Sequence, residues 1–278
     1  MGMNSVNTNV GAMVALQNLN TTNSALGTTQ SRINTGLKIA TAKDNGAVWA
    51  IAQNQRAESS SLNAVMGSLQ RGQSTVDVAL SAGQAISDIL VQMKEKAVAA
   101  SETGLTSASL KALSDEYVAL RAQIDTISDN ASFDGVNLIS DVGTSSTAVA
   151  AIANADASAT IDIAHQDLST NGSAVTGTLA TLTGGVTTAD ITDIETAIQS
   201  VSSKLSTLGT GAKALETHLN FVGKLQDTLD AGVGNLVDAD LAKESAKLQA
   251  LQTKQQLGVQ ALSIANQSSG ILLSLFRG

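Results

Sequence analysis

A heptad pattern of small and aliphatic residues continues without a break over residues 48–100. Its positions alternate in steps of three and four residues, which places them along one face of an α-helix. A helix of about 53 residues is about 80 Å long, whereas a compact globule of this chain length is about 50 Å across. The pattern therefore predicts an elongated, mainly α-helical molecule.

The composition suits long helices that pack through small side chains. The chain has no proline, so no helix interior loses a backbone donor to one. Aromatic residues make up 2% of the chain, which leaves Ala, Leu, Val and Ile to form the core. The chain also has no cysteine, which excludes a disulfide, a cysteine metal site and a thiol nucleophile.

Both ends of the chain lack charge over long stretches, although both carry apolar heptads. The first charged residue is Arg32, and residues 255–276 include no Asp, Glu, Lys or Arg. Chain ends are usually polar and frayed, so these ends indicate packing against each other and against copies of the same chain. The apolar positions that we expect in this self-assembly interface are Leu16, Leu19, Leu26, Ile33, Leu37, Leu241, Leu248, Leu251, Leu262, Leu272 and Phe276.

The N-terminal heptad run has a weak helix propensity of its own. Asn23 and Gln30 complete its spacing, Gly27 lies inside it, and Asn and Thr are abundant around it. Asn and Thr compete for backbone hydrogen bonds, and a glycine costs about 1 kcal/mol relative to alanine. We therefore expect this segment to be disordered in the monomer and to become helical on docking.

The remaining segments predict further helices around a polar insert. Apolar periodicity marks a shorter helix at 110–127 and long helical runs at 191–236 and 237–276. The pair Asp134-Gly135 predicts a tight turn, and residues 160–163 alternate like a short strand. The Ser- and Thr-rich residues 141–189 predict a surface insert of short strands and loops, with a flexible linker as the alternative.

This order of segments predicts an antiparallel helical bundle or coiled coil with a small β-hairpin and a loop insert. The long helical runs lie on either side of the insert in the sequence and are expected to be antiparallel, so both termini are expected at the same end. The expected domains are a terminal coiled coil (1–44 with 236–278), a rod with a hairpin (45–140 with 190–235), and the insert (141–189).

The sequence offers little for catalysis or for binding nucleic acids and membranes. Its histidines, His165 and His218, do not form a zinc-protease motif, and no nucleophile triad or cofactor site can be assembled. The net charge of −8 argues against a nucleic-acid partner. No apolar run is long enough to span a membrane, and the beginning of the sequence does not resemble a secretory signal peptide.

Three motifs resemble signatures of bacterial flagellin. They are RINTGLKI at 32–39 with AKD at 42–44, the hairpin-entry motif FDGVNL at 133–138, and VDADLAKE at 237–244 with ANQ at 265–267 and LLSLFRG at 272–278. The resemblance covers about 1–140 and 190–278. Its signature residues are Arg32, Gly36, Leu37, Lys43, Asp44, Asp238, Asp240, Glu244, Asn266, Gln267 and Arg277.

The resemblance implies a structural subunit of the extracellular flagellar filament, a passive helical propeller for swimming. The terminal helices then form an inner tube, the rods an outer tube, and the insert faces solvent. It also implies unfolded export by the flagellar type III apparatus without a signal peptide. The implied partners are copies of the chain, sister flagellins, junction proteins, a filament cap and an export chaperone.

Two alternatives remain at this point. Hook–filament junction proteins have similar ends, although the C-terminal motif favours flagellin. A glycan-decorated surface-binding module is the other alternative, because the insert is rich in Ser and Thr.

Residues 92–98 resemble a segment that a vertebrate innate immune receptor recognises in some flagellins. Gln92 and Lys96 depart from that segment's pattern, so we expect weak recognition.

Overall fold

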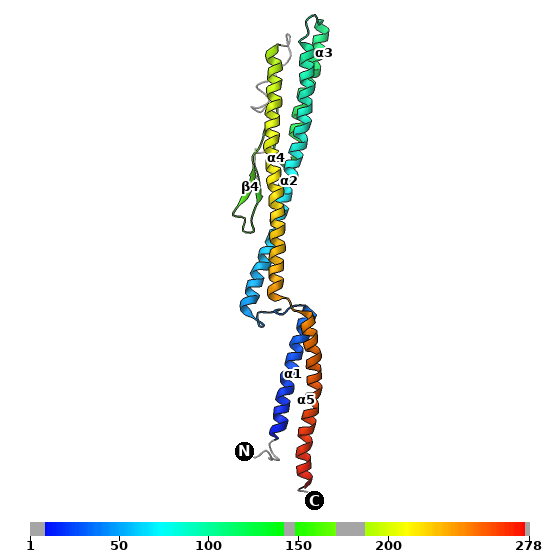
Figure 1. Cartoon of the computed structure of the whole chain (residues 1–278). Helices are drawn as coiled ribbons and strands as arrows, with labels where there is room; N and C mark the ends of the chain where they lie inside the picture. The colour runs from blue at the N-terminus through cyan, green and yellow to red at the C-terminus, as the bar shows by residue number, and fades with distance from the viewer. Residues whose placement is uncertain (1–8, 142–147, 171–186, 276–278) are drawn as a thin grey trace. The chain divides into compact units, whose positions relative to one another are not determined.

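The computed structural model describes residues 9–141, 148–170 and 187–275, with side chains as far as residue 267. Within these ranges it has five helices and two antiparallel hairpins (Figure 1), which confirms the mainly α fold class. The elements are α1 (Val10–Thr35), α2 (Gly46–Ala100), α3 (Ser107–Asn130), β1 (Ser132–Phe133), β2 (Val136–Asn137), β3 (Val149–Ile152), β4 (Thr160–Ile163), α4 (Thr188–Val237) and α5 (Leu241–Leu275).

The chain divides into two compact units, each built from distant parts of the sequence. Unit 1 comprises Met1–Ala57 and Thr228–Gly278, and unit 2 comprises Glu58–Asp227. The division runs within α2 and α4, so the linkers that follow α1 and precede α5 both belong to unit 1. The three functional domains expected from the sequence stay a prediction.

Unit 2 contains a three-helix core at the positions that the heptads predicted. Lys94 of α2 pairs with Glu195 of α4 at 2.8 Å, and Lys96 pairs with Glu116 of α3 at 2.5 Å. Between the helices, the buried heptad positions are Leu62, Val65, Leu69, Val76, Ala79, Ile86, Leu90, Met93 and Ala97 of α2, Tyr117 and Ile124 of α3, and Ile194, Val201, Leu208, Leu215 and Val222 of α4.

The predicted turns and strand are also present. Asp134 and Gly135 join β1 to β2 with φ values of 50° and 79°, as a tight hairpin turn requires. The strand expected at 160–163 is β4, which pairs with β3. One boundary differs from the prediction. Val237 ends α4 instead of starting the last helical run, because residues 238–240 break the helix before α5.

The described part of the Ser/Thr-rich insert packs closely on the helices of unit 2. A Cβ atom at Gly72 of α2 would lie 3.3 Å from the Ala151 Cβ, and one at Gly211 of α4 would lie 2.6 Å from the Ile163 Cδ1. Glycine is unfavourable inside a helix, but at these two positions it admits the β3–β4 hairpin. For residues 148–170, this packing differs from the flexible-linker alternative. Residues 142–147 and 171–186 lie outside the described ranges.

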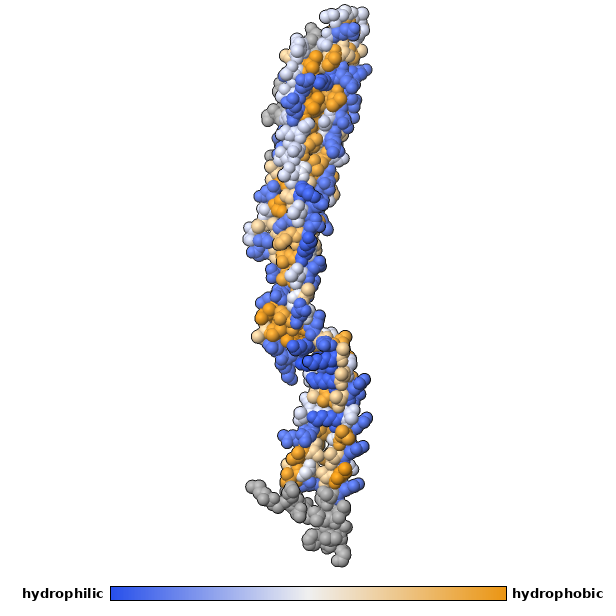
Figure 2. Space-filling model, in the orientation of Figure 1, coloured by the Kyte–Doolittle hydropathy of each residue, from blue (hydrophilic) through white to orange (hydrophobic). Residues whose placement is uncertain are grey.

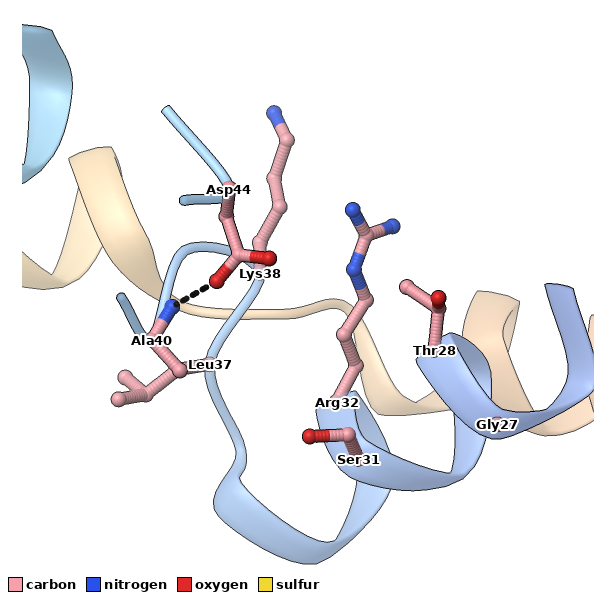
Figure 3. A pocket seen from close by; sticks show the side chains of 8 residues that line it. All are labelled: Gly27, Thr28, Ser31, Arg32, Leu37, Lys38, Ala40 and Asp44. Atoms are coloured by element: carbon pink, nitrogen blue, oxygen red, sulfur yellow. Dashed lines mark hydrogen bonds between the residues drawn. The ribbon is translucent and has the colours of Figure 1, made fainter. Parts of the chain in front are cut away.

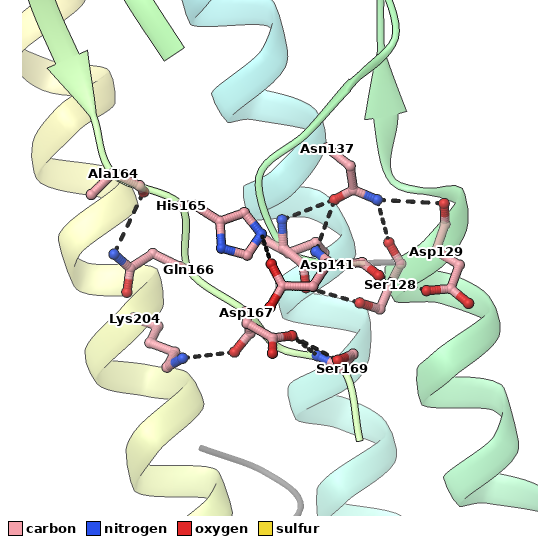
Figure 4. A network of polar contacts seen from close by, with 12 residues as sticks. Ser128, Asp129, Asn137, Asp141, Ala164, His165, Gln166, Asp167, Ser169 and Lys204 are labelled. Atoms are coloured by element: carbon pink, nitrogen blue, oxygen red, sulfur yellow. Dashed lines mark hydrogen bonds and ion pairs between the residues drawn. The ribbon is translucent and has the colours of Figure 1, made fainter. Parts of the chain in front are cut away.

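A buried asparagine ties the β1–β2 hairpin to α3 (Figure 4). The Asn137 side chain, 3% exposed as a residue, donates from Nδ2 to the Ser128 carbonyl at 2.7 Å. Its Oδ1 accepts from the backbone N–H groups of Ile139 at 2.9 Å and Ser140 at 3.1 Å. One side chain therefore satisfies backbone groups that would otherwise be buried without partners.

The segment that follows β4 runs beside this network (Figure 4). The Gln166 N–H donates to the Leu138 carbonyl at 2.7 Å, and the Leu168 N–H donates to the Ile139 carbonyl at 2.8 Å. Lys204 of α4 donates from Nζ to the Asp167 carbonyl at 2.6 Å, and burial lowers the pKa of this lysine. The insert is thereby connected to both the hairpin and α4.

Candidate self-assembly site

The charge-free ends form an antiparallel helix pair in unit 1, with α1 beside α5 (Figure 1). Positions with reduced exposure follow a heptad spacing on both helices. We call these positions the seam. On α1 they are Ala12, Ala15, Leu19, Thr22, Leu26, Thr29 and Ile33, and on α5 they are Glu244, Leu248, Leu251, Gln255, Gly258, Leu262 and Ala265.

The seam corrects the heptad assignment of α1. The predicted spacing placed Leu16, Asn23 and Gln30 on the stripe, but these residues are exposed, and the seam instead uses the residues one position earlier. The reason is close approach between the helices. A Cβ atom at Gly258 would lie 3.3 Å from the Leu19 Cδ1, so small and β-branched neighbours of Leu19 fit there better than long side chains. The sequence periodicity alone is compatible with a spacing of either three or four residues from Leu19, and so with either Leu16 or Ala15.

The other predicted interface residues have different positions. The half-buried seam residues are Leu19, Leu26, Ile33, Leu248, Leu251 and Leu262. Leu16 and Leu241 are exposed, at 47% and 49%. Leu37 lies beyond the end of α1 and packs on an apolar cluster that is described below. The side chain of Leu272 and all of Phe276 lie outside the described part of the chain.

An apolar face remains uncovered on each helix of the pair. Val10, Met13 and Val14 lie on the side of α1 away from the seam, as about 3.6 residues per turn dictates, and all three are exposed. Leu257 and Ile264, one heptad apart on α5, are 60% and 68% exposed. We call these five residues the outer apolar face. Figure 2 shows apolar residues at the surface of this pair.

The two helices also leave a groove open beside the seam. Its volume is about 360 Å³. The groove is lined by Ala15, Asn18, Leu19, Thr22, Lys254, Leu257, Gly258 and Ala261. Large apolar patches on soluble proteins mark interaction sites. The exposed face and this groove indicate that the pair is not complete within a single chain.

Polar contacts at three levels fix the register of the pair. Asn9 donates from Nδ2 to the Ala265 carbonyl at 2.7 Å. Gln255 donates from Nε2 to the Asn23 Oδ1 at 2.7 Å. Arg32 pairs with Glu244 at 3.1 Å, with side chains 27% and 12% exposed. Glu244 and Gln255 are themselves seam positions, and polar side chains at heptad positions are a known means of specifying register.

Beyond Arg32 and Glu244, the signature residues bring the two linkers together. Gly36 ends α1 with φ of 70°, a left-handed conformation that favours glycine. Its carbonyl accepts from the Ala239 N–H at 2.8 Å, and Leu37 forms an isolated antiparallel bridge with Asp238. The Lys38 N–H donates to the Val237 carbonyl at 2.6 Å. Residues about 200 positions apart are thereby joined through their backbones.

Two signature aspartates accept hydrogen bonds from backbone N–H groups, one in the linker after α1 and one at the start of α5. The Asp44 Oδ2 accepts from the Ala40 N–H at 3.2 Å (Figure 3) and from the Thr41 N–H at 3.0 Å. Hydrogen bonds from Thr41, with a contribution from the positive charge of Arg32, hold the pKa of Asp44 below its ordinary value. Asp240 caps α5, because its Oδ1 accepts from the N–H groups of residues 242 and 243 at 3.0 Å.

A small apolar cluster underlies these linkers. It consists of the buried residues Ile39, Ala52, Val233 and Val237, with Leu37, Val48, Trp49 and Leu236 packed against it. The cluster anchors the linker after α1 to the start of α2 and the end of α4, all within unit 1. Trp49 places its large ring here rather than in the seam.

Three further signature residues are exposed. Lys43 is exposed in the linker, and Asn266 and Gln267 are exposed on α5. Arg277 lies outside the described residues. Among the described residues, no helix is both long and apolar enough to cross a membrane.

Comparisons with known proteins give matches over most of the chain. The model of the bacterial flagellin N-terminal helical region matches residues 6–144, and that of the C-terminal helical region matches residues 191–276. Flagellin FljK of Caulobacter vibrioides is 58% identical over 277 residues, with 100% of both chains covered. A flagellin of Brucella melitensis is 37% identical, covering 99% of this chain and 100% of its own.

The fold is also similar to that of a solved structure. The crystal structure of Bacillus cereus flagellin superposes with a TM-score of 0.50 at 26% sequence identity. The match covers 55% of this chain and 86% of that one.

Proposed function

Since the chain belongs to the bacterial flagellin family, we propose that its α1–α5 pair is the element through which copies of the chain contact one another in the flagellar filament. Flagellins are structural proteins of the extracellular filament that serves motility, and they are not enzymes. Membership of this family establishes self-assembly, and the α1–α5 pair is the surface that we assign to it. The single observation that supports this surface is the outer apolar face.

The physical argument rests on what burial of this face contributes. A fully buried Val, Leu, Ile or Met side chain contributes about 1.5–3 kcal/mol relative to an exposed one. Met13, Leu257 and Ile264 are each at least 60% exposed, so most of this contribution is not realised in the single chain. Neighbouring copies provide the same apolar chemistry, and this part of the pair adds no charge to it, because α1 has no charged residue before Arg32 and α5 has none from residue 255 to its end.

We propose further partners on the basis of the family. The chain is expected to leave the cell unfolded through the flagellar type III apparatus and to fold under the filament cap. An export chaperone is expected to cover the C-terminal segment beforehand. Sister flagellins and junction proteins are expected neighbours in the flagellum. The absence of cysteine and proline supports this route, because neither disulfide pairing nor prolyl isomerisation can delay refolding outside the cell.

Reversing the charge at Glu244 tests whether the α1–α5 pair is needed for assembly. Glu244→Arg places two cations together in the seam, and we expect the critical concentration for polymerisation to rise about tenfold, about 1.4 kcal/mol. The double variant Arg32→Glu/Glu244→Arg restores opposite charges and most of the assembly. Sedimentation of seeded filaments measures both effects.

The control is a charge reversal on a solvent-exposed pair. Lys111→Glu, beside Asp115 with side chains 73% and 65% exposed, is expected to have little effect, as exposed pairs contribute little. Equal assembly by Glu244→Arg and wild type contradicts the proposed role of the pair. Equal loss in the single and double variants contradicts the role of this contact in register.

A further inference from the structure

Three methionines with described side chains differ strongly in exposure. Met13 of α1 is 62% exposed, Met66 of α2 is half-buried, and Met93 of α2 is fully buried. Oxidation of methionine follows solvent access, and it converts an apolar thioether into a polar sulfoxide. Met13 is therefore the residue of these three that an oxidant in solution reaches most easily.

The surroundings of Met13 make a polar group there unfavourable in an assembled state. Met13 lies beside Val10, one turn earlier, on the outer apolar face, on the side of α1 away from the seam. Residues 1–31 carry no charged side chain. A sulfoxide is tolerated in water, but on burial against another apolar surface its oxygen loses its hydrogen-bond partners.

We propose that Met13 is an oxidation site that decides whether a free subunit can assemble, with peroxide as the class of oxidant. The Met13 sulfur takes one oxygen from the peroxide, the O–O bond breaks, and water leaves. The thioether loses two electrons to the peroxide and becomes a sulfoxide. This inference rests on the proposed function, because it requires the outer apolar face to be buried in the filament.

Two consequences follow from the position of Met13. Free subunits are susceptible to oxidation, whereas subunits already in the filament are protected because neighbouring copies cover the residue. The modification is also reversible, because methionine sulfoxide reductases convert each sulfoxide epimer back to methionine. Oxidation therefore stops the addition of subunits without dismantling a filament that has already formed.

The test compares the wild-type chain with Met13→Leu, which keeps an apolar side chain of similar volume. Monomers of both are treated with dilute hydrogen peroxide, the oxidant is quenched, and seeded polymerisation is followed by sedimentation. Met1 and Met3 are present in both chains, so a difference between the two chains isolates Met13. Fragment mass spectrometry locates each added oxygen, and Met93 is the buried internal reference.

We expect oxidation to raise the critical concentration of the wild type about tenfold and to leave Met13→Leu close to its untreated value. Treatment with both reductases restores wild-type assembly, and Met13 in preformed filaments oxidises much more slowly than in monomers. Equal inhibition of both chains, or no inhibition of either, overturns the inference, as does equal oxidation of Met13 in monomer and filament. Each chain is compared with its own untreated value, so the test does not require Met13→Leu to assemble as well as the wild type, and the comparison of Met13 oxidation in wild-type monomers and filaments does not involve the variant. Failure of untreated wild type to assemble counts instead against the proposed function.

Discussion

Replacing Leu262 with aspartate yields a folded, soluble chain that does not polymerise. Leu262 is half-buried in the seam on α5, in a stretch free of charge from residue 255 to residue 276. An aspartate there introduces a carboxylate that has no cation within the stretch, and burying an unpaired charge costs several kcal/mol. The α1–α5 pair then separates, and with it the surface that neighbouring copies contact.

Electron microscopy and sedimentation after seeding measure this effect. Leu262→Met, which keeps an apolar side chain of similar volume, is the matched control and is expected to form filaments. Circular dichroism of the monomer is expected to retain the thermal transition of unit 2, because the substitution lies in unit 1. Removal of residues 255–278 is expected to have the same result as Leu262→Asp. Filaments of normal length from either altered chain contradict the expectation.

Replacing Asn137 with leucine is expected to lower the free energy of unfolding by about 3–5 kcal/mol. The substitution removes the acceptor of two buried N–H groups, those of Ile139 and Ser140, and the donor to the Ser128 carbonyl. Each buried polar group left without a partner costs about 1–3 kcal/mol. The added apolar surface offsets only part of this loss, because Asn137 is surrounded by backbone polar groups.

Urea unfolding of the monomeric chain, followed by circular dichroism, measures this change. Asn130→Leu is a suitable control, because Asn130 is exposed at the end of α3 and its side chain makes one local hydrogen bond, to the Thr126 carbonyl. We expect the control to change the free energy by less than about 1 kcal/mol. An equal effect of the two substitutions shows that the Asn137 network does not anchor the hairpin.

Long-range periodicity was sufficient to predict most of the helical structure. The stripe from Leu62 to Ala97 predicted the buried face of α2, because a stripe sustained over many turns defines one side of a helix. Local turn chemistry was equally informative at Asp134-Gly135, where positive φ values are needed. The packed hairpin of the insert was less accessible to prediction, since the glycines that admit it are far away in sequence.

The candidate site was predictable in part. The charge-free ends predicted which helices pair, and the resemblance identified the residues of the linkers. The choice between Ala15 and Leu16 required the distance between the helices, which no local pattern encodes. The bridge between Leu37 and Asp238 joins backbones that lie about 200 residues apart in the sequence. The side chains of these two residues therefore do not predict that they pair. The disorder of the α1 segment in a free monomer likewise stays a prediction.

The central claim is that neighbouring copies bury the outer apolar face, and the absence of cysteine permits a direct test. A chain with Ile264→Cys has a single thiol, and it can be copolymerised with excess wild-type chain. The measurement is the rate of maleimide labelling in monomers and in filaments. Ala159→Cys, at the exposed end of the insert hairpin, is the control. The account predicts that the thiol introduced at position 264 labels rapidly in the monomer and much more slowly in the filament, whereas the control labels at the same rate in both. Equally rapid labelling at position 264 in the filament contradicts the account.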